Sequence, residues 1–386
     1  MSLPIVSQIL DPLYHSNTRT EFKIFGRDRV YMPKMRLSSF GVSAVVDPLP
    51  VPRAQFNLEG GIYSLIKQAS LYFNDILVDQ VKDASRVLSI QKNVMSSYEA
   101  SNDSYFRRCT GLAPVWKAEN NIVLDRLPLS YKLVGLLSLA DVFPVLKQAP
   151  ALPNIYEIRV VIEYETNKGA IFANPLPQSF TVSEPKIIVD EMMDTAEVSE
   201  LLNKDMSLQV PCVLTERVIV SASTNPQSIR LMAFDGMTLI RLVANAQINN
   251  LSDIALCNSK SDVIEGEVIN FMVNSRKLLP YRGLDHPQKK LYIAGRSMGD
   301  HISPFGGADG NLVGDVLDTF EDVYSISLIN TMANKLSYTA VDVNNRINSL
   351  YFEISKTQEN TIYYYFYGLV FKYLSKKGDV VETGYM

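Results

Sequence analysis

Two strand-rich halves of similar length, joined by one short acidic stretch, constrain what this chain can fold into. In residues 18–192 and again in residues 208–386, short β-type runs alternate with turn residues. Between them, residues 193–207 place apolar side chains at helical spacing. We therefore predict an all-β chain of two consecutive eight-stranded jelly-roll sandwiches with short helical connections.

The N-terminal segment, residues 1–17, shows little periodicity and contains Pro4 and Pro12. Its apolar residues do not alternate as a half-buried strand would, and the first clear alternation begins near Thr18. We predict an arm outside the first sandwich, whose apolar side chains are reserved for contacts with other subunits.

Several segments indicate particular strands and turns. Residues 20–25 and 155–164 alternate cleanly, and residues 62–78 predict a hairpin that turns at Asn74-Asp75. A second hairpin is predicted over residues 228–246, turning at Asp235-Gly236. Residues 127–146 are apolar but hold two prolines, which favours a buried loop with a short helix.

The run at residues 361–374, TIYYYFYGLVFKYL, is apolar on both faces of a strand. Such a strand is typically buried on both faces. Tyr363–Tyr365 could instead form a stacking platform for bases or sugars, but an aromatic strand is more often part of a core. We favour the core interpretation.

Composition excludes several classes of protein. The chain has 386 residues, of which 47% are hydrophobic, enough for a large packed core. Its 37 basic and 41 acidic residues give a net charge of −4, so no positive field attracts nucleic acid. Cys109, Cys212 and Cys257 are odd in number and far apart, which favours reduced thiols in a chain folded inside a cell. The longest apolar runs are too short to span a bilayer.

The histidines and acidic residues are the candidate metal ligands of this sequence. The chain has three histidines, His15, His286 and His301, and the last two follow Asp285 and Asp300. These pairs, with Asp309 and Asp315 nearby, lack the three or four converging ligands of a metal site. We interpret residues 280–315 as an exposed, tolerant loop.

No nucleophile elbow, phosphate-binding glycine loop or metalloprotease helix motif occurs in the sequence. We therefore predict no enzyme activity, no cofactor, and no catalytic, cofactor-binding or metal-binding residues.

The order of four segments resembles that of a known family. The early strand region TEFKIFGRDRVYMPKMRLSSFGVS is followed by GGIYSLIKQASLYFNDILVDQ, then by LPLSYKLVGLLSLADVFPVL leading into NIYEIRVVIEY. KIIVDEMMDTAEVSELLNK resembles a link between two domains, and the chain closes with SLYFEISKTQENTIYYYFYGLVFKYLSKKGDVV. This series is similar to the double jelly-roll major capsid proteins of the adenovirus and tailless double-stranded DNA phage lineage, especially those of virophages, polinton-like viruses and related eukaryotic DNA viruses.

The resemblance implies a structural protein of the virion. Two rolls per chain and three chains per capsomer would give a pseudo-hexagonal homotrimer, and many capsomers would tile an icosahedral shell. The implied partners are the chain itself, neighbouring trimers, and minor and penton capsid proteins. An inner membrane beneath the shell is compatible with the family, whereas sequence-specific nucleic acid is not implied.

Two other classes of function remain open from the residues. A carbohydrate- or receptor-binding β-sandwich of the spike or lectin type would display aromatic and acidic side chains on one set of loops. A cupin-like enzyme would need several histidines on strands, and at least two of the three here are predicted to lie in loops.

Overall fold

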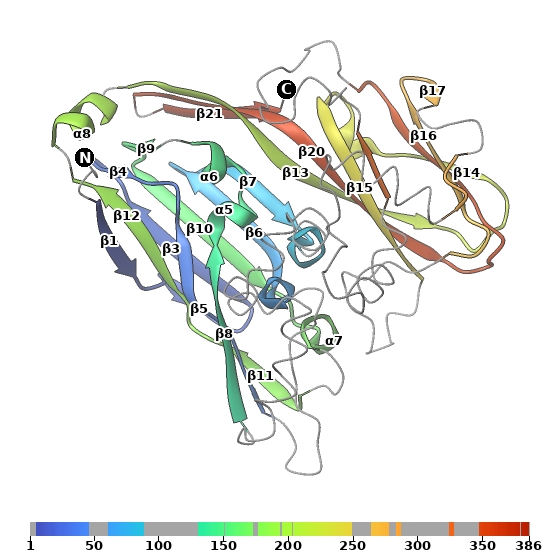
Figure 1. Cartoon of the computed structure of the whole chain (residues 1–386), viewed down its shortest axis with the longest axis horizontal. Coiled ribbons are helices and arrows are strands. Elements are labelled where there is room, and N and C mark those ends of the chain that lie inside the picture. The colour runs from blue at the N-terminus through green and yellow to red at the C-terminus, as the bar shows by residue number, and fades with distance from the viewer. Residues whose placement is uncertain are drawn as a thin grey trace, which may run out of the picture.

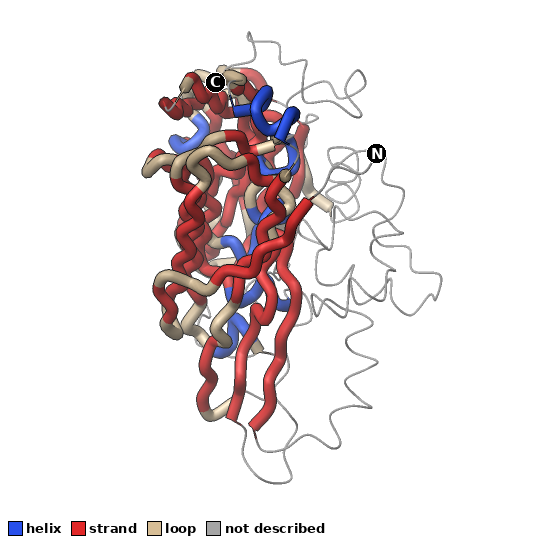
Figure 2. Tube along the Cα trace, turned by 90° about the vertical axis from the view of Figure 1, so that its left-hand side faces the viewer, coloured by secondary structure: helices blue, strands red, loops and turns tan. Residues whose placement is uncertain are grey.

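The structure is a computed structural model that describes residues 5–45, 61–88, 130–149, 151–172, 177–193, 195–202, 204–248, 264–277, 283–286, 324–327, 347–378 and 380–385. Its paired strands form four antiparallel sheets, two from the first half of the chain and two from the second. Figure 1 shows the two halves side by side, and Figure 2 shows the strands from the side, with short helices among them.

The first sandwich, as we call strands β1 to β12, contains a sheet of seven strands and a sheet of five. The larger sheet has the order β11-β5-β12-β4-β9, with β1 beside β12 and β8 beside β5. Its strands are β1 (Ile5–Leu10), β4 (Val30–Tyr31), β5 (Arg36–Val45), β8 (Ser130–Ser138), β9 (Leu152–Pro153), β11 (Ser179–Val182) and β12 (Lys186–Met192). The smaller sheet has the order β2-β3-β10-β6-β7, with β2 (Tyr14–His15), β3 (Arg19–Phe25), β6 (Ile66–Phe73), β7 (Ile76–Lys82) and β10 (Glu157–Tyr164).

The second sandwich, strands β13 to β21, contains a sheet of five strands and a sheet of four. The five-stranded sheet has the order β13-β20-β15-β18, with β21 also beside β20. Its strands are β13 (Met206–Val220), β15 (Leu239–Ile248), β18 (Tyr324–Ser327), β20 (Ile362–Lys377) and β21 (Val380–Tyr385). The other sheet has the order β14-β19-β16-β17, with β14 (Gln227–Arg230), β16 (Val268–Val273), β17 (Arg276–Lys277) and β19 (Leu350–Ser355).

Short helices connect the strands. They are η1 (Gly61–Leu65), α5 (Leu139–Val142), α6 (Val145–Gln148), α7 (Lys168–Ile171), α8 (Thr195–Leu202) and η3 (Met232–Phe234). The longest of these, α8, lies within the segment 193–207 and leads into β13. In the part of the chain that the structure describes, no helix has the length and apolar character needed to cross a membrane.

The clearest sequence predictions are confirmed. Residues 66–73 and 76–82 form the predicted hairpin, and both turn residues, Asn74 and Asp75, have positive φ. Strand β10 lies between β3 and β6, and its alternating residues Ile158, Val160 and Ile162 are buried in the core, as predicted. The segment predicted as a buried loop with a short helix, residues 127–146, holds α5 and α6 but also a nine-residue strand, β8.

The prediction of a hairpin over residues 228–246 is wrong. Strand β14 pairs with β19, whereas β15 pairs with β20 and β18, so the two strands belong to opposite sheets of the sandwich. The residues between them form η3, and Leu231 and Phe234 are buried in the core. Gly236 does supply a turn with φ of +75°, but this turn carries the chain across the core instead of along one sheet.

The prediction that residues 1–17 form an arm outside the sandwich is also wrong for the described residues. Strand β1 pairs along its whole length with β12, and β2 pairs with β3. Ser7 donates to Asp190 at 2.6 Å, and Gln8 donates to Glu191. The backbone groups of β1 that face β12 are satisfied by this pairing.

Candidate functional site

The five-stranded sheet of the second sandwich packs against the first sandwich with its outer face. Residues of β20 belong alternately to two cores: Tyr364 and Phe366 lie in the core of the second sandwich, and Tyr365 and Tyr367 lie in the core cluster of the first. Val210 and Val213 of β13 and Val243 of β15 also belong to the first cluster. We call this contact the seam, and it joins the halves through a continuous apolar core instead of a flexible link.

Within the second sandwich, aromatic rings pack against one another from three strands. The Phe352 ring lies 4.8 Å from that of Tyr364 and 5.0 Å from that of Phe366, between centroids. Phe271 packs against Phe352 at 5.7 Å, and the Tyr364 hydroxyl donates to the Glu267 carboxylate. The aromatic strand is therefore core, as predicted, and Tyr364 and Tyr365 do not form an exposed stacking platform.

Polar side chains cross the seam at two points. The Lys372 ammonium of β20 donates to the Val78 carbonyl of β7 at 2.7 Å. The Arg86 guanidinium of the first sandwich lies 3.7 Å from the ring centroid of Tyr365, a cation–π distance. Lys372 and Arg86 are both buried, so each replaces lost hydration with a contact from the opposite sandwich.

Asp79 of β7 is the most perturbed acid at the seam. Its side chain is buried, with the Lys372 ammonium and the Gln80 backbone N–H as the groups that favour its charged form. Burial raises its pKa to about 7, and the attraction of Lys372 and of the Gln80 backbone N–H lowers this pKa only in part. Burial likewise raises the pKa of the Cys212 thiol of β13, and it raises the pKa of Tyr385 of β21 to about 12.

The seam holds the two sandwiches together. Its titratable groups are not arranged for catalysis. The Cys212 thiol stays protonated, so it is a poor nucleophile and a poor metal ligand. Asp79 is closed off from solvent and therefore cannot meet a substrate.

The residues considered as metal ligands do not come together where the structure describes them. Asp285 and His286 are exposed, while His301, Asp300, Asp309 and Asp315 lie outside the described residues. His15 lies in β2, where its ring contacts the Thr20 hydroxyl at 2.7 Å and the Val182 carbonyl at 3.2 Å. Among the described residues, no three histidine, cysteine, aspartate or glutamate side chains form a group that could hold a metal.

The predicted exposed loop at 280–315 is described only over residues 283–286, where Asp285 and His286 are exposed but Gly283 and Leu284 are buried. Leu284 is buried and exchanges backbone hydrogen bonds with Ile269 of β16, at 2.8 and 3.1 Å. Gly283 makes this approach possible, because its φ is +66° and an added Cβ would meet the Ile269 carbonyl. This part of the segment is an extension of the sheet.

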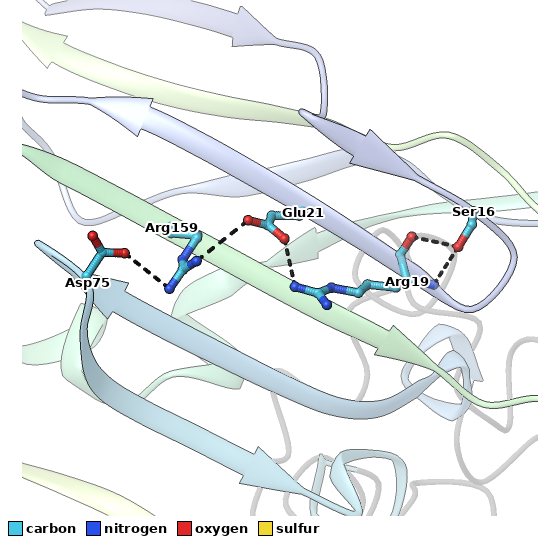
Figure 3. Close-up of polar contacts among 5 residues, drawn as sticks. All are labelled: Ser16, Arg19, Glu21, Asp75 and Arg159. Carbon is cyan, nitrogen blue, oxygen red and sulfur yellow. Dashed lines mark hydrogen bonds and ion pairs between the residues drawn. The ribbon is translucent and has the colours of Figure 1, made fainter.

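The outer face of the five-stranded sheet in the first sandwich is polar. Figure 3 shows a row of ionic contacts across β3, β10 and the turn after β6. Arg19 pairs with Glu21 at 2.7 Å, and Arg159 pairs with Glu21 at 3.9 Å and with Asp75 at 3.3 Å. Such a row of partly exposed charges keeps this face solvated, so it is a poor candidate for a permanent apolar contact.

The seam residues that sequence reasoning missed are Asp79, Arg86 and Lys372. Of these, Lys372 carried a usable signal, because it interrupts the apolar run TIYYYFYGLVFKYL. A charge inside a strand that is buried on both faces needs a partner across the interface. The identity of that partner depends on how the two sandwiches pack.

No sequence model of a known family matches the chain, and no curated protein matches it in sequence. Solved virus structures are nevertheless similar over nearly its whole length. A chain of the PBCV-1 virus capsid matches with a TM-score of 0.64 and 11% identity, covering 100% of this chain and 98% of that one. The mavirus major capsid protein matches with a TM-score of 0.58 and 11% identity, covering 98% and 90%.

The Faustovirus major capsid protein matches with a TM-score of 0.54 and 8% identity, covering 96% of this chain and 90% of that one. At such low identities the likeness shows the fold and not the function. The chain therefore has the predicted double jelly-roll fold, and its two sandwiches are the two rolls.

Proposed function

We propose that this chain is a structural major capsid protein that resides in the virion. The observation that carries the proposal is the match of the whole double roll, at TM-scores of 0.54 to 0.64, to chains of virus capsids and to major capsid proteins. A fold shared by one domain would say little, but here the order and packing of both sandwiches agree. The proposed role is architectural, with no enzymatic step.

The seam supports this proposal physically. A shell subunit must transmit contact forces without bending between its domains, and a continuous core of β13, β15 and β20 against the first sandwich provides that stiffness. We propose residues 18–192, together with β1, and residues 208–386 as the two rolls. Three chains would place six similar rolls around one axis and give a pseudo-hexagonal homotrimer.

The proposed partners are further copies of this trimer, with minor and penton capsid proteins at the places where the lattice of trimers changes. Permanent subunit contacts in obligate complexes bury about 2,000 Å² or more. The solvent-accessible surface area of the chain is 18495 Å², which leaves room for several such contacts. The spike or lectin alternative is not favoured, because the likeness over the whole chain is to chains of virus capsids and to major capsid proteins.

Negative-stain electron microscopy of the purified chain tests the proposal. We expect discrete particles with a six-sided outline and a three-fold axis, together with sheets or closed shells at high concentration. Monomers with the shape of a single double roll at every concentration would contradict the proposed role.

A further inference from the structure

The contacts of strand β1 are concentrated on one neighbour, β12. All six residues of β1 pair with β12 in a continuous register, and Figure 1 shows the two strands side by side at the margin of the first sandwich. Among the described residues, the side-chain hydrogen bonds of β1 also go to β12, from Ser7 to Asp190 and from Gln8 to Glu191. Leu10 alone packs against the core of the first sandwich. The β12 edge is therefore a nearly complete receiving site for the segment IVSQIL.

The link between β1 and β2 does not tie β1 to its own chain. The two strands belong to different sheets and do not pair with each other. Residues 11–13 join them, and Pro12 favours an extended conformation at Asp11. Three link residues and six strand residues, at about 3.3 Å each, reach about 30 Å from β2. Strand β1 can therefore leave its own β12 without breaking a strand pair with β2, and it can reach a neighbouring copy.

Strand β2, in contrast, is anchored in its own chain. It pairs with β3, and the His15 ring contacts the Thr20 hydroxyl at 2.7 Å and the Val182 carbonyl at 3.2 Å. The Thr20 hydroxyl is buried and lies 2.6 Å from that of Tyr164. Asn17 Oδ1 accepts from the backbone N–H of Val182 at 3.0 Å. The boundary between a fixed segment and an exchangeable one therefore falls within residues 11–13.

Exposed apolar side chains gather around this link. Ile9 is 64% exposed, Leu13 is 66% exposed and Tyr14 is 53% exposed. If β1 pairs with another copy, the link passes between two first sandwiches, where these side chains are covered and removed from water. Exchange of β1 therefore keeps the contacts with β12 and adds burial around the link.

We propose that β1 is exchanged in the assembled protein: it pairs with β12 of the next copy of this chain, in the register that it has here with its own β12. The exchange deepens the proposed function and rests on it. Around a three-fold axis it closes into a ring, in which each copy gives one strand and receives one. The polarity of the β1–β12 pair is unchanged, so all copies keep the same orientation relative to the axis.

The occupant of the β12 edge is a second copy because that edge already matches this strand. Its backbone register, its contacts with Ser7 and Gln8, and the 2.9 Å ion pair between Asp11 and Lys186 all recur when an identical segment arrives from a neighbour. Every such contact broken within one chain is formed again between chains. Exchange of an identical element is for this reason a low-cost route to an oligomer.

A cysteine pair across β1 and β12 of the full chain tests the exchange. Ile9 lies opposite Ile188. Opposed residues of an antiparallel pair have Cα atoms about 4.5–5.5 Å apart, within the range of a disulfide. The Ile9→Cys/Ile188→Cys variant is purified in reductant, oxidised mildly and run on a denaturing gel without reductant. We expect a covalent species of about three times 43.3 kDa, because three bonds between chains close the ring.

The matched control is a cysteine pair across β2 and β3. Tyr14 lies opposite Glu21, and this pair stays within one chain. The oxidised Tyr14→Cys/Glu21→Cys variant should therefore run at 43.3 kDa. The unmodified chain under the same oxidant controls for its native cysteines, and thermal unfolding of each reduced variant controls for folding.

The proposal is overturned if the oxidised Ile9→Cys/Ile188→Cys variant runs at 43.3 kDa with its thiols consumed, since β1 then pairs within its own chain. Failure of this pair to oxidise, while the Tyr14→Cys/Glu21→Cys pair does, would show that β1 leaves β12 and would also overturn it. A ladder extending beyond three chains would contradict the closed ring. Light scattering separates the two proposals: a trimer with β1 paired in its own chain removes only the exchange, whereas a monomer contradicts the proposed function as well.

Discussion

The two sandwiches bury their strands in different ways. In the first, β3 and β10 alternate between buried and exposed positions, and their outer face carries the ion pairs of Figure 3. In the second, β20 is buried on both faces, because one face packs on its own sandwich and the other on the first. The sheet that contains β20 therefore forms an inner layer between the cores of the two sandwiches.

This difference explains the two kinds of strand sequence. A sheet with one solvated face needs alternation, whereas a sheet between two cores needs apolar residues at nearly every position. Three of the buried charged side chains, Asp79, Arg86 and Lys372, lie at the seam, where strands of the two sandwiches meet. The following predictions test whether the second sandwich is the more sensitive of the two.

The largest effect is expected in the aromatic core of the second sandwich. Phe366→Ala removes a fully buried ring that contacts Phe352 and Phe271, and it should lower the free energy of unfolding by about 3–5 kcal/mol. Phe25→Ala is the control for an exposed ring, because Phe25 is 63% exposed. Chemical denaturation measures both, and equal losses would show that Phe366 is not buried in a packed core.

A smaller effect is expected at Gly368, in the middle of β20. A Cβ at this position would meet the buried ring of Phe234, so Gly368→Ala should cost about 1–3 kcal/mol through overpacking. In a Phe234→Ala background the same change should cost much less, since the ring is gone. A double-mutant cycle by denaturant unfolding measures this coupling, and additive costs would show that the ring is not the obstacle.

The seam should also make stability depend on pH. Burial holds the pKa of Asp79 at about 7 in the folded chain, above the ordinary value of 3.8 that applies when it is unfolded. The folded state thus binds one extra proton between these values, so this contribution to stability is present below about pH 4 and is lost as the pH rises to about 7. Asp79→Asn should flatten this fall in the melting temperature.

Asp28→Asn is the control for Asp79, because the Asp28 side chain is 81% exposed and should not change the profile. Thermal melts from pH 4 to pH 8 compare the three chains. A profile of Asp79→Asn parallel to that of the native chain would mean that the Asp79 carboxyl is solvated in solution.

The smallest effect is expected on the solvated face of the first sandwich. Glu21→Gln removes the negative charge shared by Arg19 and Arg159, and it should cost about 0–1 kcal/mol because both arginines are partly exposed. Added salt should reduce the difference from the native chain. A loss as large as that of Phe366→Ala would show that this face is covered in the assembled protein.

Much of the fold can be predicted from the sequence, for identifiable reasons. Strands β3, β6, β7 and β10 follow from alternation and from turn residues at Asn74 and Asp75, which are local signals. Burial of β20 on both faces follows from its nearly continuous run of aromatic and aliphatic residues. These features depend on residues close together in the chain.

The errors concern pairing between distant segments. Asp235-Gly236 marks a turn, but only the positions of β19 and β20 decide that the chain crosses between sheets there. The pairing of β1 with β12 joins residues about 180 positions apart, and no local pattern encodes it. The charge partners at the seam were missed for the same reason, since Lys372 meets a carbonyl of β7 and not a residue near it in the chain.

The central claim is that the double roll is a subunit that assembles with its own copies. The most direct test is the mass of the purified chain in solution, measured by light scattering at micromolar concentration. The account predicts about three times 43.3 kDa, because obligate oligomers often lack a stable folded monomer. A well-folded monomer of 43.3 kDa across the whole concentration range would contradict it.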